Sequence, residues 1–416
     1  MSFKYLRRVG LAIGLSVAFT AHAAETPSQE QMWQIIQQQQ RQIEELQAQL
    51  ANTNVKVEET DQKVEVAGDM IEQASFSSAS GASSWSERTR IGGYGEMHYN
   101  NLDSKEELDF HRFVLYFNHD FNDRIKLVSE LELEHAIAGD GQDGEIELEQ
   151  AYINFSFSDT VASRAGLFLM PVGILNETHE PNTFFGVERN PVEKNIIPTT
   201  WWENGADIHG ELAPGFSFDA AVTSGFDVDT TGSKAFLVRD GRQKGSKAKA
   251  DDLAYTGRLK WTGMPGVELA ASGQYQSDVT QGDLDVSATL LEAHADIRRG
   301  PFGLRALYAR WDLDDDDVID ASDPAAVGRD EQEGWYIEPS LRGSLWNIPG
   351  KLGVFARYSV WDNNAGASND TEFKQLDLGV NYWPIPEVVL KFDVQQQDNE
   401  GNKDDNGYNL GIGYAF

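Results

Sequence analysis

The chain has 416 residues and a formal net charge of -33 at pH 7, and it contains no cysteine. The acidic charge excludes nucleic acid as a partner, because phosphates are bound by Lys and Arg, and the lack of cysteine excludes disulfides, thiolate metal sites and cysteine nucleophiles. The mean hydropathy of -0.46 excludes a helical membrane protein, since no later window has the roughly 20 consecutive apolar residues that a spanning helix needs.

Residues 1–23 have the pattern of a secretory signal peptide. Basic residues precede an apolar run from Val9 to about Phe19, and Ala21-His22-Ala23 gives the small-x-small pattern of a cleavage site. The apolar run is too short to act as a stop-transfer helix. We therefore expect this segment to be removed during export beyond the inner membrane.

Residues 29–74 have the heptad spacing of a coiled coil. Aliphatic residues occupy position a of six consecutive heptads: Ile36, Ile43, Leu50, Val57, Val64 and Ile71. The d positions are partly polar, so the seam suits a helix bundle that a second interface supports. A lone amphipathic or partly disordered arm is the alternative. Residues 75–87, which follow, are rich in Ser, Ala and Gly and are predicted to be a flexible linker.

From residue 88 onward, apolar and polar residues alternate with the period of β-strands. The last strand shows this most clearly, since Tyr408, Leu410, Ile412, Tyr414 and Phe416 alternate with small or polar residues. Such a strand, with aromatic residues at both ends of one apolar face, resembles the closing strand of bacterial outer-membrane barrels. An edge strand of a soluble sandwich has the same pattern and is the alternative.

About sixteen such strands are predicted over residues 88–416, and an even number is what single-chain bacterial barrels have. Short turns are expected to alternate strictly with long polar loops, which assigns the turns to the periplasm and the loops to the outside. The short turns are expected near Asn122, Ser158, Pro214, Pro265, Gly300, Asn347 and Pro384.

The longest interruption of the alternation is residues 171–204, which form the third external loop on this assignment. A connection of this length inside a compact domain is usually functional. Its charged residues are the candidates for a pore constriction: Glu177, Glu180, Glu188, Arg189, Glu193, Lys194 and Glu203. We hypothesise that its acids face inward arginines and set up a transverse field, and the alternative is that they are solvated loop charges.

The residues that alternate with the apolar face are expected to line the pore, with mixed signs and a slight acidic excess. They include Arg112, Arg164, Arg258, Arg310, Arg342, Arg357, Glu130, Glu132 and Glu134. Around Arg310 the pattern places Leu307, Ala309 and Trp311 on the lipid side. Arg305 then falls on the same outer face, where its side chain would reach the headgroups.

No motif indicates catalysis, a cofactor or a metal. There is no Gly-x-Ser-x-Gly, and the acidic run from Asp312 to Asp323 has calcium-loop offsets but carries Asp317 where the turn needs glycine. The basic cluster from Arg239 to Lys249 either attracts anions to the pore mouth or is merely solvated.

The segment Gly166-Leu-Phe-Leu-Met-Pro-Val-Gly173, the following Val187-Glu188-Arg189 and the Arg112 strand together resemble the phosphate-selective porin O and P family. The resemblance implies a trimeric sixteen-stranded pore whose third loop folds inward and lines the constriction. Family members select anions with a dense ladder of arginines, whereas this chain has a mixed-sign wall that should not strip phosphate of its water.

We therefore predict an outer-membrane porin that passes small hydrophilic solutes and ions by passive diffusion. An anion- or phosphate-selective porin is the main alternative, followed by a structural tether or a barrel enzyme. The expected partners are outer-membrane lipid, lipopolysaccharide and two further copies of the chain. The periplasmic coiled coil is expected either to contact peptidoglycan or to support trimer assembly.

Overall fold

The computed structural model describes residues 85–416, except 140, 283, 346 and 400–403. The predicted signal peptide (1–23) and coiled coil (29–74), and the linker up to residue 84, lie outside the described residues. A short 3-10 helix, η1 (Trp85–Glu87), leads into the first strand.

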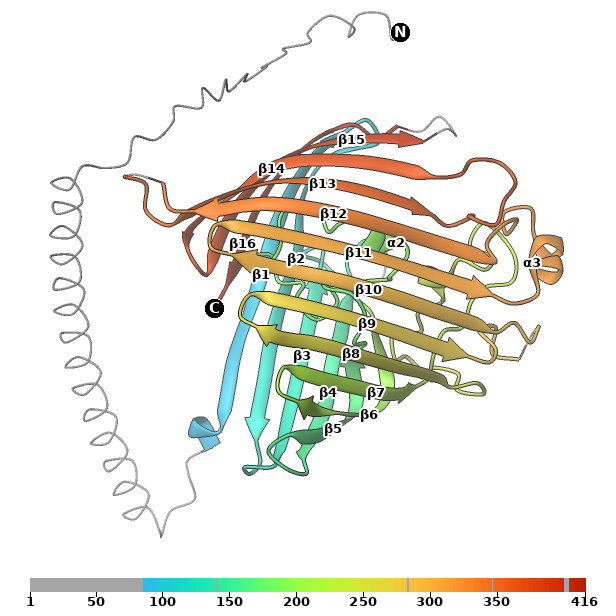
Figure 1. Cartoon of the computed structure of the whole chain (residues 1–416), viewed down its shortest axis with the longest axis horizontal. Coiled ribbons are helices and arrows are strands. Elements are labelled where there is room, and N and C mark those ends of the chain that lie inside the picture. The colour runs from blue at the N-terminus through green and yellow to red at the C-terminus, as the bar shows by residue number, and fades with distance from the viewer. Residues whose placement is uncertain (1–84, 140, 283, 346, 400–403) are drawn as a thin grey trace, which may run out of the picture. The chain divides into compact units, whose positions relative to one another are not determined.

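The described residues form sixteen antiparallel strands that close into a barrel, which confirms the predicted fold class (Figure 1). Closure is made by β1 and β16, which pair from Tyr94 opposite Ala415 to Leu102 opposite Gly407. The strands are β1 (Thr89–Leu102), β2 (Glu106–Asp120), β3 (Ile125–Glu134), β4 (Ile146–Ser156), β5 (Val161–Leu169), β6 (Trp202–Ala213), β7 (Phe216–Thr223), β8 (Ala254–Met264), β9 (Val267–Gln276), β10 (Ala288–Arg299), β11 (Phe302–Leu313), β12 (Glu331–Gly343), β13 (Lys351–Asp362), β14 (Phe373–Ile385), β15 (Val388–Asn399) and β16 (Gly407–Ala415).

The alternation along most strands separates an apolar outer face from a polar inner face. In β2, Leu115 and Phe117 are exposed on the outside, whereas Arg112 is buried inside. In β3, Leu131 is exposed on the outside and Glu132 is buried. Among the described residues, no helix is long and apolar enough to cross a membrane.

The two ends of the barrel differ in their connections (Figure 1). One end has short turns, at residues 121–124, 157–160, 214–215, 265–266, 300–301, 344–350 and 386–387. The other end carries the long loops, which include helices α2 (Val192–Asn195), η2 (Val238–Gly241) and α3 (Asp316–Ser322). Six expected turn residues lie in these turns, and Pro384 lies at the end of β14, two residues before its turn.

Strict alternation of short turns and long loops is a wrong prediction at one place. Only residues 103–105 join β1 to β2, and the Leu102 amide donates to the Lys105 carbonyl at 2.8 Å. The pairing of β1 with β2 continues to the rim through polar residues such as Asn100 and Glu107. Backbone hydrogen bonds hold the two strands together there, and they do not require apolar side chains.

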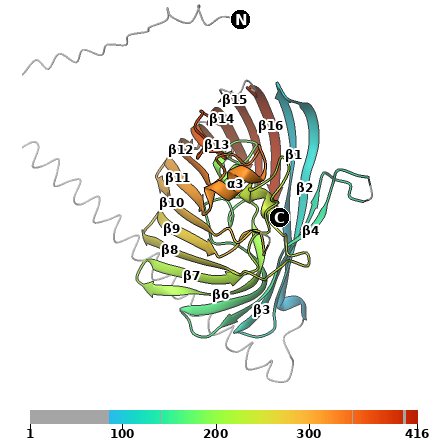
Figure 2. The ribbon, with the colours of Figure 1, turned by 90° about the vertical axis from the view of Figure 1, so that its right-hand side faces the viewer.

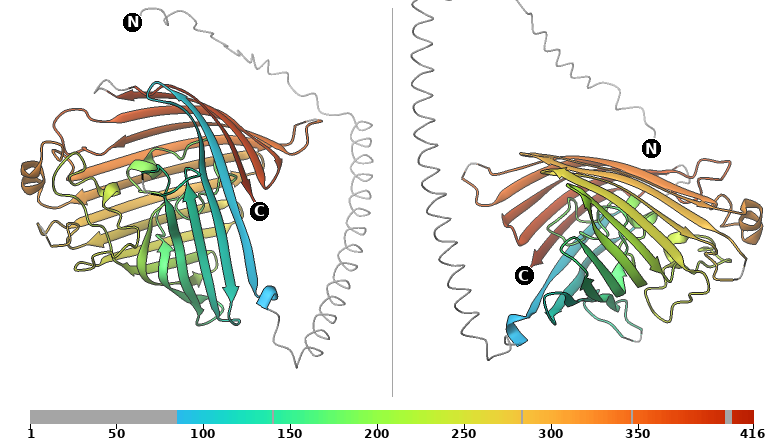
Figure 3. Two further views of the ribbon diagram at one scale, coloured as in Figure 1. Left: turned by 180° about the vertical axis from the view of Figure 1, so that it is seen from behind. Right: turned by 60° about the horizontal axis from the view of Figure 1, so that its bottom comes forward.

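The loop between β5 and β6 lies inside the barrel. Figure 2 looks onto the long-loop end and shows this segment within the ring of strands, and the left view of Figure 3 shows α2 in front of the orange strands of the far wall. We call residues 170–201 loop L3, and residues 224–253, between β7 and β8, loop L4. The two loops pack with the inner faces of β10 to β12 into the main apolar core, which includes Trp201, Phe226, Phe236 and Trp311.

This core explains why the predicted phase of β11 is wrong. Leu307 and Trp311 are only 3% and 1% exposed and point inward, while Tyr308 is 43% exposed on the outside. The inner face of β11 is apolar because it packs against L3, where Trp311 Nε1 donates to the Ile196 carbonyl at 3.0 Å. The apolar face of β11 therefore contacts protein and not lipid.

With the corrected phase, the two arginines of β11 lie on the opposite sides from those predicted. Arg310 points to the outside, where it pairs with Asp312 and Glu331 at 2.7 Å, so it does not line the pore as predicted. Arg305 is buried inside, with Nε 3.0 Å from Asp296 Oδ2, and does not reach the headgroups.

The first prediction tests this phase. Changing Arg305 to Met should lower the free energy of unfolding by about 1–3 kcal/mol, because it removes the partner of an inward carboxylate. Changing Arg310 to Met should cost less than about 1 kcal/mol, because its ion pairs are exposed. Denaturant midpoints of the folded barrel measure both changes. Equal midpoints for the two variants would instead support the phase of β11 predicted from the sequence.

Candidate functional site

Three wall arginines hold the backbone of L3. The guanidinium of Arg112 on β2 donates to the His179 carbonyl at 2.9 Å. Arg305 on β11 donates to the Thr183 carbonyl at 3.1 Å. Arg357 on β13 donates to the Phe185 carbonyl at 3.3 Å. A loop inside a barrel has no ladder partners of its own, so the wall satisfies its polar backbone groups.

Each of these arginines is also paired with an inward carboxylate. Arg112 Nε lies 2.6 Å from Glu96, and Arg357 Nε lies 3.0 Å from Asp377. Arg305 has its partner in Asp296. Because the Arg fork presents five donors, one side chain binds a carboxylate and a carbonyl at the same time. The charges of these three arginines are therefore largely neutralised, and their remaining donors hold the loop.

The acids of L3 have three different roles. Glu193 is buried, and its Oε1 accepts from the backbone amides of Ile174 and Leu175 at 2.6 and 2.7 Å. Its other oxygen accepts from the Tyr336 hydroxyl at 2.9 Å. Glu193 therefore shapes the loop and does not face the pore.

Glu177 and Glu188 bind the wall. Glu177 pairs with Arg258 on β8. Glu188 Oε1 lies 3.2 Å from His98 Nδ1 and accepts from Asn100 Nδ2 at 3.0 Å. Burial alone would raise the pKa of the Glu188 carboxyl, but His98 outweighs it and places that pKa well below the usual range.

Two further candidates lie outside the pore-facing part of L3. Glu203 is buried at the start of β6 and accepts from Trp201 Nε1 at 3.0 Å. Glu180 is half-buried in L3, and its carbonyl accepts from Thr183. Neither contacts the inward arginines that the field hypothesis invoked.

A second clamp on L3 is a buried histidine between two glutamates. His179 Nε2 lies 3.6 Å from Glu130 on β3 and 3.5 Å from Glu149 on β4. Burial lowers the pKa of an imidazole, but the two carboxylates outweigh it and raise the pKa of His179 to about 10. The charged ring therefore binds L3 to the wall at neutral pH.

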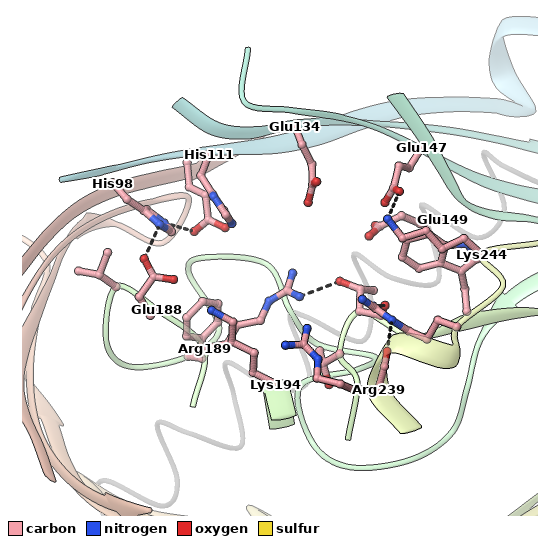
Figure 4. Close-up of a pocket in the computed structure, with 17 residues that line it drawn as sticks. His98, His111, Glu134, Glu147, Glu149, Glu188, Arg189, Lys194, Arg239 and Lys244 are labelled. Atoms are coloured by element: carbon pink, nitrogen blue, oxygen red, sulfur yellow. Dashed lines mark hydrogen bonds and ion pairs between the residues drawn. The ribbon is translucent and has the colours of Figure 1, made fainter. Parts of the chain in front are cut away.

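L3 and L4 leave a cavity of about 210 Å³ against β1 to β4 (Figure 4). One side is the wall, where Figure 4 shows His98, His111, Glu134 and Glu147 in a row. The carboxylates of Glu132, Glu134 and Glu147 lie within 4.8 Å of one another. The wall side of the cavity is therefore acidic.

The opposite side of the cavity is basic. Figure 4 shows Arg189 and Lys194 of L3 beside Arg239 of L4, and Arg242 also lines the cavity. Within the described part of the chain, no carboxylate lies within ion-pair distance of any of these four side chains, whereas Lys244 pairs with Glu145 and Glu147. Burial, together with Arg239, lowers the pKa of Arg242 to about 10, which still leaves it charged at pH 7.

The remaining predicted wall residues are distributed along the lumen. Arg164 pairs with Asp207, and the guanidinium carbon of Arg342 lies 3.7 Å from the Trp383 ring centre near the short turns. Glu130 belongs to the clamp on His179. Only Glu134, Glu188, Arg189 and Lys194 of the predicted set line the cavity itself.

Sequence reasoning missed Glu147, Glu149 and His98 as cavity residues. The signal for the glutamates was present, because Glu145, Glu147 and Glu149 alternate with Ile146 and Leu148. Gln150 also points inward, although it directly follows the inward Glu149. The reason is a shift in register at this point of the β3–β4 pair. A bulge moves the phase and so interrupts the period of two.

A closed sixteen-stranded barrel with an apolar outside, a charged lumen and an internal loop defines a class, and the chain is a porin channel of the outer membrane. The model of the family "Phosphate-selective porin O and P" matches residues 92–415, and the chain belongs to this family. This fold and family are those of a channel rather than an enzyme.

Other proteins are similar to this chain in sequence or in fold. An uncharacterized protein of Aquifex aeolicus is 32% identical over 350 residues, which cover 78% of this chain and 79% of that protein. The anion-selective porin from Comamonas acidovorans has a TM-score of 0.53 at 14% identity, with 79% of this chain and 99% of that chain covered. OmpT of Vibrio cholerae in its trimer form has a TM-score of 0.51 at 12% identity, with 79% and 99% covered. At these identities the solved structures show the fold alone.

The second prediction concerns the clamp at His179. Because its pKa is raised, the stabilisation is complete below the ordinary value of 6.5 and is lost as pH rises through about 10. The ionisable groups that face the His179 ring are Glu130, Glu149 and Tyr94, and the Arg112 guanidinium binds the carbonyl of His179. Single-channel conductance should therefore become larger and noisier between about pH 9 and 11 as L3 loosens.

The variant His179→Gln isolates this clamp from other groups that titrate in the same range. It should already be noisy at pH 7, should lose about 3–5 kcal/mol of stability and should respond less to alkaline pH. His209→Gln, on β6, is the matched control. A wild-type pH profile in the His179 variant would show that the clamp does not hold the loop.

Proposed function

We propose that the barrel passes small hydrophilic solutes and ions by passive diffusion, and that the pore is narrowed where L3 and L4 approach β1 to β4. The observation that carries this proposal is the cavity with acids on its wall side and unpaired cations on its loop side. Opposite charges that face each other across water create a field perpendicular to the path of the solute.

The dimensions favour small solutes. A cavity of about 210 Å³ is below the roughly 300–1,000 Å³ of pockets that enclose drug-sized ligands. Its lining is charged on both sides, so a polar solute can exchange contacts with water for contacts with either face. The transverse field thus has the opposite sign to the hypothesis from the sequence, since the acids lie mainly on the wall and the cations on the loops.

Anion preference is the second candidate, and one observation favours it. Arg189, Lys194, Arg239 and Arg242 have no carboxylate partner among the described residues, whereas the wall arginines are mostly neutralised. Unpaired cations in a narrow place attract anions more than a count of all inward charges suggests. The family description points in the same direction.

The third prediction separates the two candidates. In planar bilayers with asymmetric KCl, Lys194→Gln combined with Arg239→Gln should move the reversal potential toward cation preference. Glu134→Gln should move it toward anion preference, because it weakens the acidic face. Lys234→Gln removes one positive charge from an exposed part of L4, where the double variant removes two, and is the control for each single charge.

Ion preference that follows only the total charge of each variant, with Lys234→Gln as effective as the cavity changes, would contradict the transverse field. A purified protein that gives no stepwise conductance would favour the tether or the barrel enzyme instead.

We further propose a homotrimer in contact with outer-membrane lipid and lipopolysaccharide, with residues 1–23 removed and residues 29–74 forming a periplasmic coiled coil. The trimer form of the structurally similar Vibrio cholerae protein supports the assembly, and the heptads support the helix bundle. The bundle would either contact peptidoglycan or stabilise the trimer.

The fourth prediction addresses that segment. Deleting residues 29–74 should lower the temperature at which unboiled trimers dissociate on gels, because a three-helix interface is lost. Sedimentation with peptidoglycan sacculi tests the other role. A full-length protein that migrates as a monomer without boiling would contradict the proposed trimer.

A further inference from the structure

Three side chains on the lumen wall beside the cavity bring two imidazoles and one carboxylate together. Asp109 Oδ2 lies 3.2 Å from His111 Nδ1 and 2.8 Å from His135 Nδ1. The three atoms all lie within 4.8 Å of one another. All three side chains are only half-buried, so an ion in the lumen can reach them.

The backbone assembles this group in two steps. Asp109 and His111 are two residues apart on β2, so they share one face of the strand. A bulge opposite Met97 then shifts the register, which lets Arg112 also point inward beside them.

The third member comes from the end of β3. His135 leaves the strand with φ of 52°, and its amide donates to the His111 carbonyl at 3.0 Å. Positive φ is uncommon for a residue with a side chain. This conformation places the His135 ring beside Asp109.

A neighbouring histidine is committed to other partners. His98 stacks on His111 with ring centres 4.6 Å apart, and its two nitrogens lie 3.1 and 3.2 Å from Glu96 and Glu188. It therefore supports the His111 ring, and it leaves Asp109, His111 and His135 as the candidate ligands.

The ligand types and spacing fit a divalent transition metal. Two atoms bound to tetrahedral zinc at about 2.0–2.1 Å lie about 3.3 Å apart, close to the distances from Asp109 to the two histidines. Imidazole nitrogens favour zinc, copper and nickel, whereas calcium and magnesium prefer oxygen ligands alone. Three protein ligands leave at least one coordination position for water.

We propose that Asp109, His111 and His135 form a binding site for a divalent transition-metal ion on the lumen wall. His111 also lines the cavity, so a bound ion adds positive charge to the acidic face beside Glu134. The site goes beyond the diffusion function and does not depend on which solutes the channel passes.

The fifth prediction tests the site with Zn²⁺ and Cu²⁺ on the full-length protein in detergent. Calorimetry should show Zn²⁺ binding, and His135→Asn should weaken it at least about tenfold, because losing only an outer-shell partner of a metal ligand already costs about that much. Asparagine tolerates positive φ, so this variant should keep the backbone. Cu²⁺ resonance spectra should show two nitrogen ligands in the wild type and one in the variant.

His209→Asn is the matched control, because His209 Nδ1 also lies 3.1 Å from an aspartate oxygen but belongs to no three-ligand group among the described residues. It should bind Zn²⁺ like the wild type. Asp109→Asn should also weaken binding, and heat-dependent gel mobility confirms that each variant folds.

In bilayers, Zn²⁺ should shift the ion preference toward anions in the wild type and not in His135→Asn. Unchanged Zn²⁺ affinity in His135→Asn would overturn the proposal and assign the metal to another place, such as the His179 clamp. An equal loss in His209→Asn, or no binding by the wild type, would overturn it as well.

Discussion

The structure of this channel depends on arginines that bind two acceptors at once. A loop that crosses the inside of a barrel has backbone carbonyls that no strand can pair, and leaving them unpaired in a narrow lumen is costly. Arg112, Arg305 and Arg357 supply those carbonyls with donors from three parts of the wall. Their charge is acceptable there because each also meets an inward carboxylate.

This double use of arginine changes how the charge of the lumen should be interpreted. Inward acids and bases are numerous, but most of them cancel in pairs and are occupied in holding L3. The charges that a passing solute meets are the few without an ionic partner, and these lie on the loops and, on the wall, at Glu134 of β3. Net charge of the wall is therefore a poor guide to selectivity in this protein, and local pairing is the better one.

Several ionic contacts lie along one side of the lumen. The clamp on His179, the pair of His98 with Glu188 and the group around Asp109 all involve β1 to β4. The opposite side, at β10 to β12, is an apolar core with Trp311 and Phe226. L3 is thus held by ionic contacts with β1 to β4 and, at β10 to β12, by apolar packing together with the hydrogen bond from Arg305. These contacts explain how a long connection has a defined place inside the barrel.

The sequence alone determined the barrel, the number of its strands and the facing of most side chains, because a period of two is a local property of a strand. It failed at β11, where the apolar residues Leu307 and Trp311 cover L3 instead of facing lipid, since hydrophobicity does not distinguish protein from lipid. Only the tertiary structure decided which charges are paired and which histidines meet. Those contacts join residues from different strands and loops, and register, bulges and the path of L3 set them.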